Sequence, residues 1–329
     1  MKNRRDILQA GTASLAAVSL GGTWAGRAHA AGWPDRTIKV VVPSAAGSAI
    51  DVVPRIVFEP VAAQLGQTMV VENRPGGSTS TGAIAVAKAD PDGYTMLVHS
   101  NALVTVPVVQ PSVMLDPSKD LSAVSLMGKL PMVLVISPDK GLRTVKELVA
   151  KAKANPGATN YAAAGIGTPV HLTMERFRLA AGFEGQLVPF RGAPEALTEV
   201  MTGRVDIYFC PITAAMSLIK DGKILALAVS GTKRAAALPD VPTTIEAGVP
   251  DSEFEFWVGA FMPKKTPREI INKLHDEIVK GLNQPATQSK LAGIGVEPMS
   301  MRPEAFDAQI AKETEIVRKI VKAANLEVK

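Results

Sequence analysis

The sequence predicts an α/β fold with a mainly parallel sheet. Short runs of β-branched residues, such as residues 38–42, alternate with longer amphipathic stretches that predict helices. Turn residues separate the two kinds of segment, as in Asp90-Pro91-Asp92-Gly93. Such alternation is typical of parallel sheets covered by helices. A mature chain of about three hundred residues also favours two domains, or one large domain.

The first thirty residues predict a cleaved export signal. Lys2, Arg4 and Arg5 precede a mostly small or apolar stretch over 7–24, and Ala28-His29-Ala30 supplies the small residues of a signal-peptidase site. The apolar stretch is short and no stop-transfer pattern follows it, so we expect no retained membrane anchor. The arginine pair resembles a twin-arginine signal, and an ordinary secretory signal is the alternative. We therefore expect an exported, soluble chain that begins at about residue 31.

The composition argues against a nucleic-acid partner. The export signal holds four basic residues and one acidic residue, so its removal lowers the formal charge from +5 to about +2. Aromatic residues make up only 5% of the chain, and no basic cluster is interleaved with them. Cys210 is the only cysteine, which excludes an intrachain disulfide.

The segment from Val40 to Arg55 predicts a buried strand, a tight turn and the start of a helix. Pro54 lacks an N–H, which costs nothing only in the first turn, so we expect the helix to begin near Ile50. Asp51 then lies near the N-cap, where it either caps the helix or faces a ligand. Unpaired N–H groups and a partial positive charge suit such a helix end to an anion.

The remaining elements follow from the same patterns, taken in order. A glycine-rich turn at 73–78 joins a strand to a helix of small residues, and a Thr-x-x-Glu capping box at Thr144 and Glu147 opens a later helix. We take the apolar run over 130–137 as the crossing into a second domain. The other strands are expected over 69–71, 95–99, 160–163, 187–189, 205–209, 223–230 and 255–262, and the helices over 51–65, 81–89, 144–154, 169–181, 193–202, 267–282 and 303–324.

Signatures of catalysis and of metal binding are absent from the sequence. It has no Gly-x-Ser-x-Gly elbow and no phosphate-binding loop, and Val170 stands where a dinucleotide fingerprint starting at Gly165 needs a third glycine. No histidine lies at metal-ligand spacing. We therefore expect no catalytic residue, no metal, no cofactor and no enzyme. The alternative is an exported hydrolase that uses Ser44 or Ser48 with His171.

Three turns of small residues are suited to binding a small anion. They lie at Pro43–Asp51, at Ala164–Thr168, where Thr168 can cap a helix, and at Phe190–Pro194. Each follows a strand and precedes a helix, which is where open α/β sheets bind ligands. If they converge, their N–H groups can hold a carboxylate without a metal. The alternative is that these are ordinary connections, in which small residues are common.

The sequence resembles the periplasmic solute-binding receptors of tripartite tricarboxylate transporters, the Bug family, along essentially the whole mature chain. The order and number of the matching motifs make the resemblance specific. They are Trp33-Pro34 with 38–43, 47–55, 71–77, 89–95, 161–168 with His171-Leu172, 188–192, and 238–243 with 246–248.

The resemblance implies a two-lobed periplasmic-binding-protein fold of the Venus-flytrap kind, type II-like, with a central ligand cleft. One lobe would comprise residues 31–130 and 251–329, and the other residues 131–250. It also implies a small organic carboxylate as ligand and the membrane subunits of a tripartite transporter as partners, although a ligand-sensing receptor without a transporter is the alternative. We expect a periplasmic monomer.

The ligand-binding residues implied by the resemblance come from the three turns and from adjacent strand ends. They are Ser44, Ala46, Gly47, Ser48, Ile50, Asp51, Ser100, Asn101, Ala164, Gly165, Gly167, Thr168, His171, Phe190, Arg191, Gly192 and Cys210.

Four departures from the family pattern bear on the ligand. Ser48 and Ile50 stand where a glycine and a threonine are common, Ala163 replaces a frequent serine, and Phe190-Arg191 replaces Tyr-Lys. Because the changes at Ile50, Ala163 and Phe190 remove hydroxyl groups, we expect a ligand less hydroxylated than citrate, such as an apolar or aromatic carboxylate.

Overall fold

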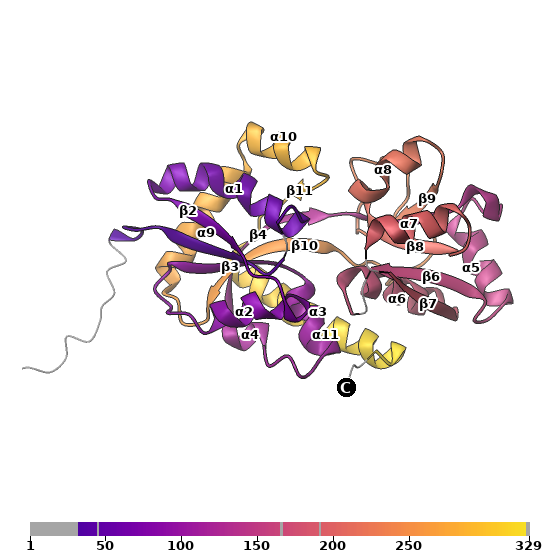
Figure 1. Ribbon diagram of the computed structural model, residues 1–329, viewed down its shortest axis with the longest axis horizontal. Helices are drawn as coiled ribbons and strands as arrows, with labels where there is room; N and C mark the ends of the chain where they lie inside the picture. The colour runs from indigo at the N-terminus through magenta and orange to yellow at the C-terminus, as the bar shows by residue number, and fades with distance from the viewer. Residues whose placement is uncertain (1–31, 45, 165–166, 191, 327–329) are drawn as a thin grey trace, which may run out of the picture.

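The computed structural model describes residues 32–44, 46–164, 167–190 and 192–326. Within these residues the chain forms two α/β lobes that lie side by side, each built on its own sheet (Figure 1). The predicted export signal lies outside the described residues. No helix in the described part of the chain is long and apolar enough to cross a membrane.

The sheet of the first lobe has the strand order β11-β4-β10-β3-β1-β2. β1 pairs in parallel with β2 and β3, whereas β10 runs antiparallel to both β3 and β4. The strands are β1 (Ile38–Val42), β2 (Met69–Asn73), β3 (Thr95–Ser100), β4 (Leu121–Leu130), β10 (Phe256–Pro263) and β11 (Glu297–Pro298).

The sheet of the second lobe has the order β7-β6-β8-β5-β9. β6 pairs in parallel with β7 and β8, and β5 runs antiparallel to β8 and β9. Its strands are β5 (Met132–Ile136), β6 (Thr159–Ala164), β7 (Gly185–Phe190), β8 (Ile207–Pro211) and β9 (Leu225–Val229).

The two sheets are mixed, so the prediction of a mainly parallel sheet was wrong. The antiparallel pairs involve the strands next to the crossings between lobes. β4 ends at Leu130 and β5 begins at Met132, with only Pro131 between them, and β10 returns to the first lobe after β9 (Figure 1). A strand that returns from the other lobe enters its sheet in the opposite direction, and a local pattern does not encode this direction.

Helices cover both faces of the first sheet. α1 (Ala49–Leu65) and α9 (Arg268–Leu282) pack on one face, where Val57, Phe58 and Leu274 belong to one buried cluster. α3 (Ala102–Val109) and α11 (Pro303–Ala324) pack on the other, with Phe306 in the cluster. α11 also packs against α6 (Pro169–Ala181) of the second lobe.

The predicted elements are largely confirmed, with differences at their ends. Thr144 and Glu147 form the predicted capping box at the start of α5 (Val145–Ala154). α2 (Ser80–Ala87), α6, α7 (Ala193–Met201), α9 and α11 lie where helices are predicted. Four α-helical segments were not predicted, namely α3, α4 (Pro117–Asp120), α8 (Ile212–Lys220) and α10 (Pro285–Gly293).

α1 begins within one residue of its predicted start, but Pro54 does not lie in the first turn. The helix begins at Ala49 with Ser48 as N-cap, so Pro54 lies in the second turn and Asp51 is the third helical residue. α1 therefore lacks one intrahelical hydrogen bond at Pro54 and another at Pro60. Burial of Val53, Val57 and Val61 against the sheet supports the helix despite both losses.

Candidate functional site

The turn between β1 and α1 is held by hydrogen bonds within itself. Ser44 Oγ donates to Ser48 Oγ over 2.8 Å, and Gly47 N donates to Asp51 Oδ2 over 2.8 Å. Gly47 has a φ of +80°, a conformation that glycine adopts without strain. Asn73 Nδ2 ties the turn to β2 by donating to the Ser44 carbonyl oxygen over 3.0 Å.

Asp51 is the anchor of this turn. It is 2% exposed, and its Oδ1 accepts hydrogen bonds from Arg55 Nε at 3.0 Å and from Asn73 Nδ2 at 2.9 Å. Burial alone would raise the pKa of Asp51, but the hydrogen bonds from Arg55, Gly47 and Asn73 hold this pKa below its usual value. Both carboxylate oxygens are engaged inside the protein, so Asp51 shapes the turn.

Backbone N–H groups are available at the start of α1. Those of Asp51 and Val52 donate to the Ser48 carbonyl oxygen, each over 2.9 Å. No described group accepts from the N–H groups of Ser48, Ala49 or Ile50. The Ile50 side chain packs against the core of the first lobe, so this residue offers its backbone at the turn. The helix end can therefore donate to an anion.

The turn before α6 is fixed by a buried histidine. Gly167 N donates to His171 Nδ1 over 3.0 Å, and His171 N donates to Thr168 Oγ1 over 3.3 Å. Thr168 therefore caps the N-terminus of α6, as predicted. His171 is 0% exposed, and burial lowers its pKa despite the nearby Glu175. Its ring therefore shapes the turn from within.

The same turn brings the two lobes into contact. Gly167 has a φ of +75°, and a Cβ added to it would lie 2.7 Å from Cγ1 of Val109 on α3. Gly165 lies outside the described residues. Ala164 is the last residue of β6.

The third turn leads into α7 with Gly192 as its N-cap, in extended conformation. The Phe190 ring is half-buried and packs on the core of the second lobe, as Val188 does. Arg191 lies outside the described residues. The turn thus resembles the first one, in that an apolar side chain faces its own lobe.

Three other predicted residues are buried away from open space. Ser100 Oγ accepts from Ala102 N over 3.2 Å, and Asn101 Nδ2 donates over 3.0 Å to the carbonyl oxygen of Glu255, next to the crossing into β10. Cys210 is 0% exposed among the apolar residues under α7 and α8, and burial raises the pKa of its thiol. The thiol of Cys210 lies in the core of its own lobe.

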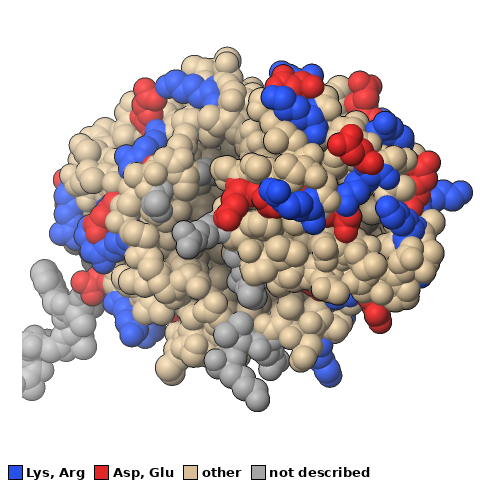
Figure 2. All heavy atoms as spheres, turned by 45° about the vertical axis from the view of Figure 1, so that its right-hand side comes forward, with Lys and Arg blue, Asp and Glu red and all other residues tan. Residues whose placement is uncertain are grey.

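A cavity of about 450 Å³ lies between the lobes beside the first turn. The face in Figure 2 is hollowed between the two halves of the molecule. The first lobe contributes two segments to the cavity wall, and the second contributes the start of α8 and the loop after β9. The described lining residues are Gly47, Val52, Ile212, Thr213, Met216, Ala237, Ala292, Gly293, Ile294 and Gly295.

Of these residues, only Gly47 belongs to the predicted site. Two signals could have indicated the others. Pro211 follows a predicted strand and precedes an amphipathic stretch over 212–220, which repeats the strand–turn–helix pattern of the three turns. Gly293 and Gly295 flank Ile294 between a helix and a strand, but nothing in the local pattern says that they face another lobe.

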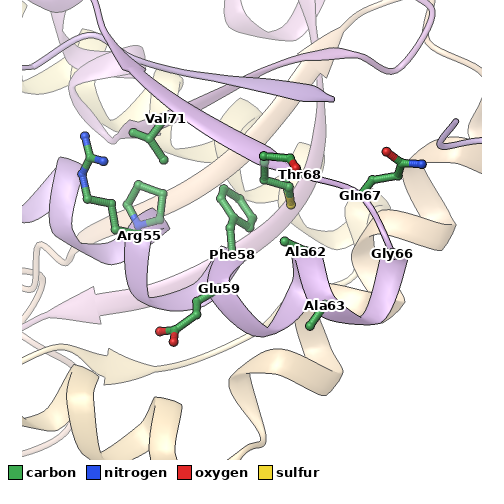
Figure 3. A pocket seen from close by; sticks show the side chains of 11 residues that line it. Arg55, Phe58, Glu59, Ala62, Ala63, Gly66, Gln67, Thr68 and Val71 are labelled. Carbon is green, nitrogen blue, oxygen red and sulfur yellow. The ribbon is translucent and has the colours of Figure 1, made fainter. Parts of the chain in front are cut away.

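A larger cavity, of about 610 Å³, lies between α1 and β2 (Figure 3). Phe58, Ala62 and Val71 line it, with Arg55 and Glu59 on its rim. All its lining residues belong to the first lobe, and β2 is the edge strand of that sheet. None of the predicted turns lines it, so its size does not make it the candidate site.

Comparisons with known proteins point to one family. The family model described as "Tripartite tricarboxylate transporter family receptor" matches residues 53–326. A UPF0065 protein of Pseudomonas sp. strain P51 is 35% identical over 290 residues, covering 88% of this chain and 86% of that protein. Protein BugT of Bordetella pertussis is 32% identical over 283 residues, covering 85% of this chain and 87% of that protein.

Solved structures agree in fold. Rpa4515 of R. palustris, solved with adipate, is 30% identical with a TM-score of 0.76, covering 89% of this chain and 98% of that chain. MatC of Rhodopseudomonas palustris, solved with bound malate, is 28% identical with a TM-score of 0.72, covering 88% of this chain and all of that chain. The two-lobed fold predicted from the sequence is that of these binding proteins.

Proposed function

Because this chain belongs to the receptor family of the tripartite tricarboxylate transporters, the Bug proteins, we propose that it binds a small organic carboxylate between its lobes. As a solute-binding receptor it would deliver this ligand to the membrane subunits of a tripartite transporter. Two relatives of the same fold are described with bound adipate and malate, which are both carboxylates.

The observation that carries the proposal is the turn at the start of α1. Ser48, Ala49 and Ile50 present N–H groups without described acceptors, and Asp51 fixes the turn through its two oxygens. Gly47 of this turn lines a cavity together with Thr213 of the second lobe. A carboxylate at this helix end is stabilised by N–H donors and by the helix dipole, and the second lobe can close over it.

The proposed lobes are residues 31–130 with 251–329, and residues 131–250. The crossing at Pro131 and the connection from Val229 to Phe256 support these bounds. All strands of the second-lobe sheet lie within residues 131–250, and all strands of the first-lobe sheet lie before or after this segment. We propose that ligand binding closes the lobes about these two connections.

The proposed ligand contacts differ in kind among the predicted residues. Ser44, Ala46, Gly47, Ser48, Ile50, Gly167, Thr168, Phe190 and Gly192 are proposed to contact the ligand, Ile50 and Phe190 through their backbone. Asp51 and His171 are proposed to hold their turns in shape, through Gly47 and Gly167. Gly165 and Arg191 stay predictions from the sequence.

The ligand is proposed to be less hydroxylated than citrate. Ile50 and Phe190 pack their apolar side chains on the cores, so neither position supplies the hydroxyl that the family pattern often has there. Ala163 gives weaker support, since its methyl group is 0% exposed within β6. Tight binding of citrate, with no binding of benzoate-like or nicotinate-like acids, would contradict this proposal in calorimetry.

A thermal-shift screen of organic acids tests the proposal directly. A ligand at one hundred times its dissociation constant stabilises the folded chain by about 2.7 kcal/mol, which raises the melting temperature by several degrees. We expect at least one carboxylate to give a saturable rise. The matching amide serves as the control, because it lacks the charge and should give none.

The competing function is hydrolysis by Ser44 or Ser48 with His171. The His171 ring is buried and its Nδ1 accepts from Gly167 N, and no hydrogen bond among the described residues joins it to Ser44 or Ser48. We therefore propose that the chain is not an enzyme. Saturable turnover of esters or amides that is lost in Ser48→Ala would overturn this.

The proposed site of action is the periplasm. Residues 1–30 carry the features of an export signal, and the solved relatives include a periplasmic transporter protein that is 31% identical. We propose that the receptor acts as a monomer. Light scattering of the mature chain, with and without its ligand, measures this state.

A further inference from the structure

We propose that the cavity between the lobes is an apolar subsite that receives the hydrocarbon chain of a monocarboxylate. This inference rests on the proposed function, in which the carboxylate lies at the start of α1. It concerns the hydrocarbon part of the ligand, which extends from the carboxylate into the cavity. The ligand would be an unbranched aliphatic acid of medium length, with its charged end toward Gly47.

The cavity lies next to the position proposed for the carboxylate. Gly47 and Val52 line it from the β1–α1 segment, beside the proposed carboxylate position, and Ile212, Thr213 and Met216 line it from α8. A molecule that extends from the helix end into this space therefore touches both lobes. Its volume of about 450 Å³ falls in the range of about 300–1,000 Å³ that small-molecule sites occupy.

The wall of the cavity is mostly apolar. Val52, Ile212, Met216 and Ile294 present aliphatic or thioether groups, and Thr213 supplies the single hydroxyl among the described lining residues. None of the described lining residues is charged. A second carboxylate placed here would lose its hydration without gaining a cation, which is costly, so the chemistry favours an uncharged chain.

Gly293 helps to keep the cavity open, because it has no side chain to fill it. A Cβ added to Gly293 would meet no atom within 4 Å, and the φ of Gly293 lies outside the range that only glycine favours. A larger residue at Gly293 could thus fill the space without backbone strain. At the cavity's other edge, a Cβ on Gly295 would lie 2.3 Å from Thr213 Cγ2, so the lobes already touch there.

The experiment measures dissociation constants for straight-chain monocarboxylates from propionate to octanoate by calorimetry. Each methylene buried in the wild-type cavity should tighten binding about fourfold, until the cavity is full. Gly293→Leu should weaken the binding of the long acids by tenfold or more and leave propionate unchanged. Ala237→Leu, from the second lobe, should act in the same way.

Gln288→Leu is the matched control, since Gln288 is an exposed residue of α10 that does not line the cavity. It should keep the wild-type dependence on chain length, and circular dichroism checks that each variant is folded. Dissociation constants that do not change with chain length would overturn the subsite, as would Gly293→Leu and Ala237→Leu variants that both keep the wild-type series. Failure of the whole monocarboxylate series, while the thermal-shift screen finds another acid that binds, would also overturn the subsite. Failure of every organic acid in both experiments would instead overturn the proposed function.

Discussion

Single residues set the shape of the first turn. Asp51 makes the largest contribution, because its charged carboxylate accepts three hydrogen bonds there. Its two oxygens collect hydrogen bonds from a backbone N–H, a guanidinium and an amide. A neutral amide at this position would remove the charge that pairs with Arg55, leaving Asn73 Oδ1 as its other hydrogen-bond acceptor, and would replace one acceptor oxygen by an NH₂ group that faces donors.

We expect Asp51→Asn to lower the free energy of unfolding by about 1–3 kcal/mol, the cost of leaving buried hydrogen-bonding groups unsatisfied. Ligand affinity should fall with it, because the turn at Gly47 loosens. Urea unfolding and calorimetry measure the two effects. Glu59→Gln is the control, since Glu59 pairs with Lys290 on the exposed side of α1 and should matter by less than about 1 kcal/mol. Equal effects of both variants would contradict the role of Asp51.

His99 should make the protein less stable in acid. It is 1% exposed, and burial lowers its pKa to about 4, although the carbonyl oxygens of Thr79 and Ser100 oppose this shift. The unfolded chain, with a histidine pKa near 6.5, binds the proton first, so stability falls as the pH drops from 6.5 through 4.

The expected loss from His99 at pH 4 is about 3 kcal/mol, relative to pH 7. Denaturant unfolding across this range measures it, with His99→Gln as the variant. The variant should show a smaller decline than the wild-type protein. A parallel decline in the two proteins would show that the proton binds elsewhere.

At the scale of elements, α11 and β10 are joined by one buried carboxylate. Glu313 Oε2 accepts from Trp257 Nε1 over 2.7 Å, while its Oε1 is buried without a partner among the described atoms. Burial raises the pKa of Glu313 to about 7, and the Trp257 hydrogen bond only partly opposes this. The folded chain is therefore more stable when this carboxyl group is protonated, although the Trp257 hydrogen bond itself favours the charged form.

Because the pKa of Glu313 is raised in the folded chain, its stabilising effect is complete below about pH 4.5 and is lost as the pH rises through 7. We expect Glu313→Gln to be more stable than the wild-type protein at pH 8, by about 1–3 kcal/mol, and similar to it at pH 5. Thermal unfolding at both values measures this. Glu315→Gln, exposed on the same helix, should change stability equally at both. A gain for Glu313→Gln that does not depend on pH would contradict the titration.

The elements that could be predicted from sequence are those with a local signal. Thr144 and Glu147 mark the start of α5, and the amphipathic pattern marks α11 from Pro303 to Ala324. α3 has no such signal, because six of its eight residues are buried, Pro107 lies inside it, and its apolar residues show no helical period. Burial against α11 stabilises this helix, and that contact is tertiary.

The candidate site divides in the same way. The turn at Gly47 and the cap at Thr168 follow from short-range patterns, and the structure has both. The wall formed by Met216 and Ile294 depends on how one lobe docks on the other. These two residues are 78 positions apart in the sequence. No local pattern around either one predicts that both line the same cavity.

At the scale of the molecule, the lobes meet at Gly295 and Thr213, and a cross-link can test this contact. A Cβ on Gly295 would lie 3.7 Å from the Cβ of Thr213, close to the mean of about 3.8 Å for disulfides. We expect the double variant Gly295→Cys, Thr213→Cys to form a disulfide that holds the lobes together. Ligand binding should then be slowed at least tenfold and restored by a reductant.

Each single cysteine variant is the control for this cross-link, because Cys210 is buried and should not pair with either new thiol. Stopped-flow binding before and after reduction measures the effect. An oxidised double variant that binds as fast as its reduced form would contradict lobe opening on binding.

The position of β10 has a consequence for the order in which the lobes can form. Its neighbours β3 and β4 lie more than one hundred residues earlier, yet β10 stands between them in the first sheet. The second lobe is one continuous segment, whereas the first cannot complete its sheet until the chain has passed through the second and returned. During synthesis the second lobe is therefore the part that can fold early. A chain stopped before residue 256 should leave the edges of β3 and β4 unpaired and prone to aggregate.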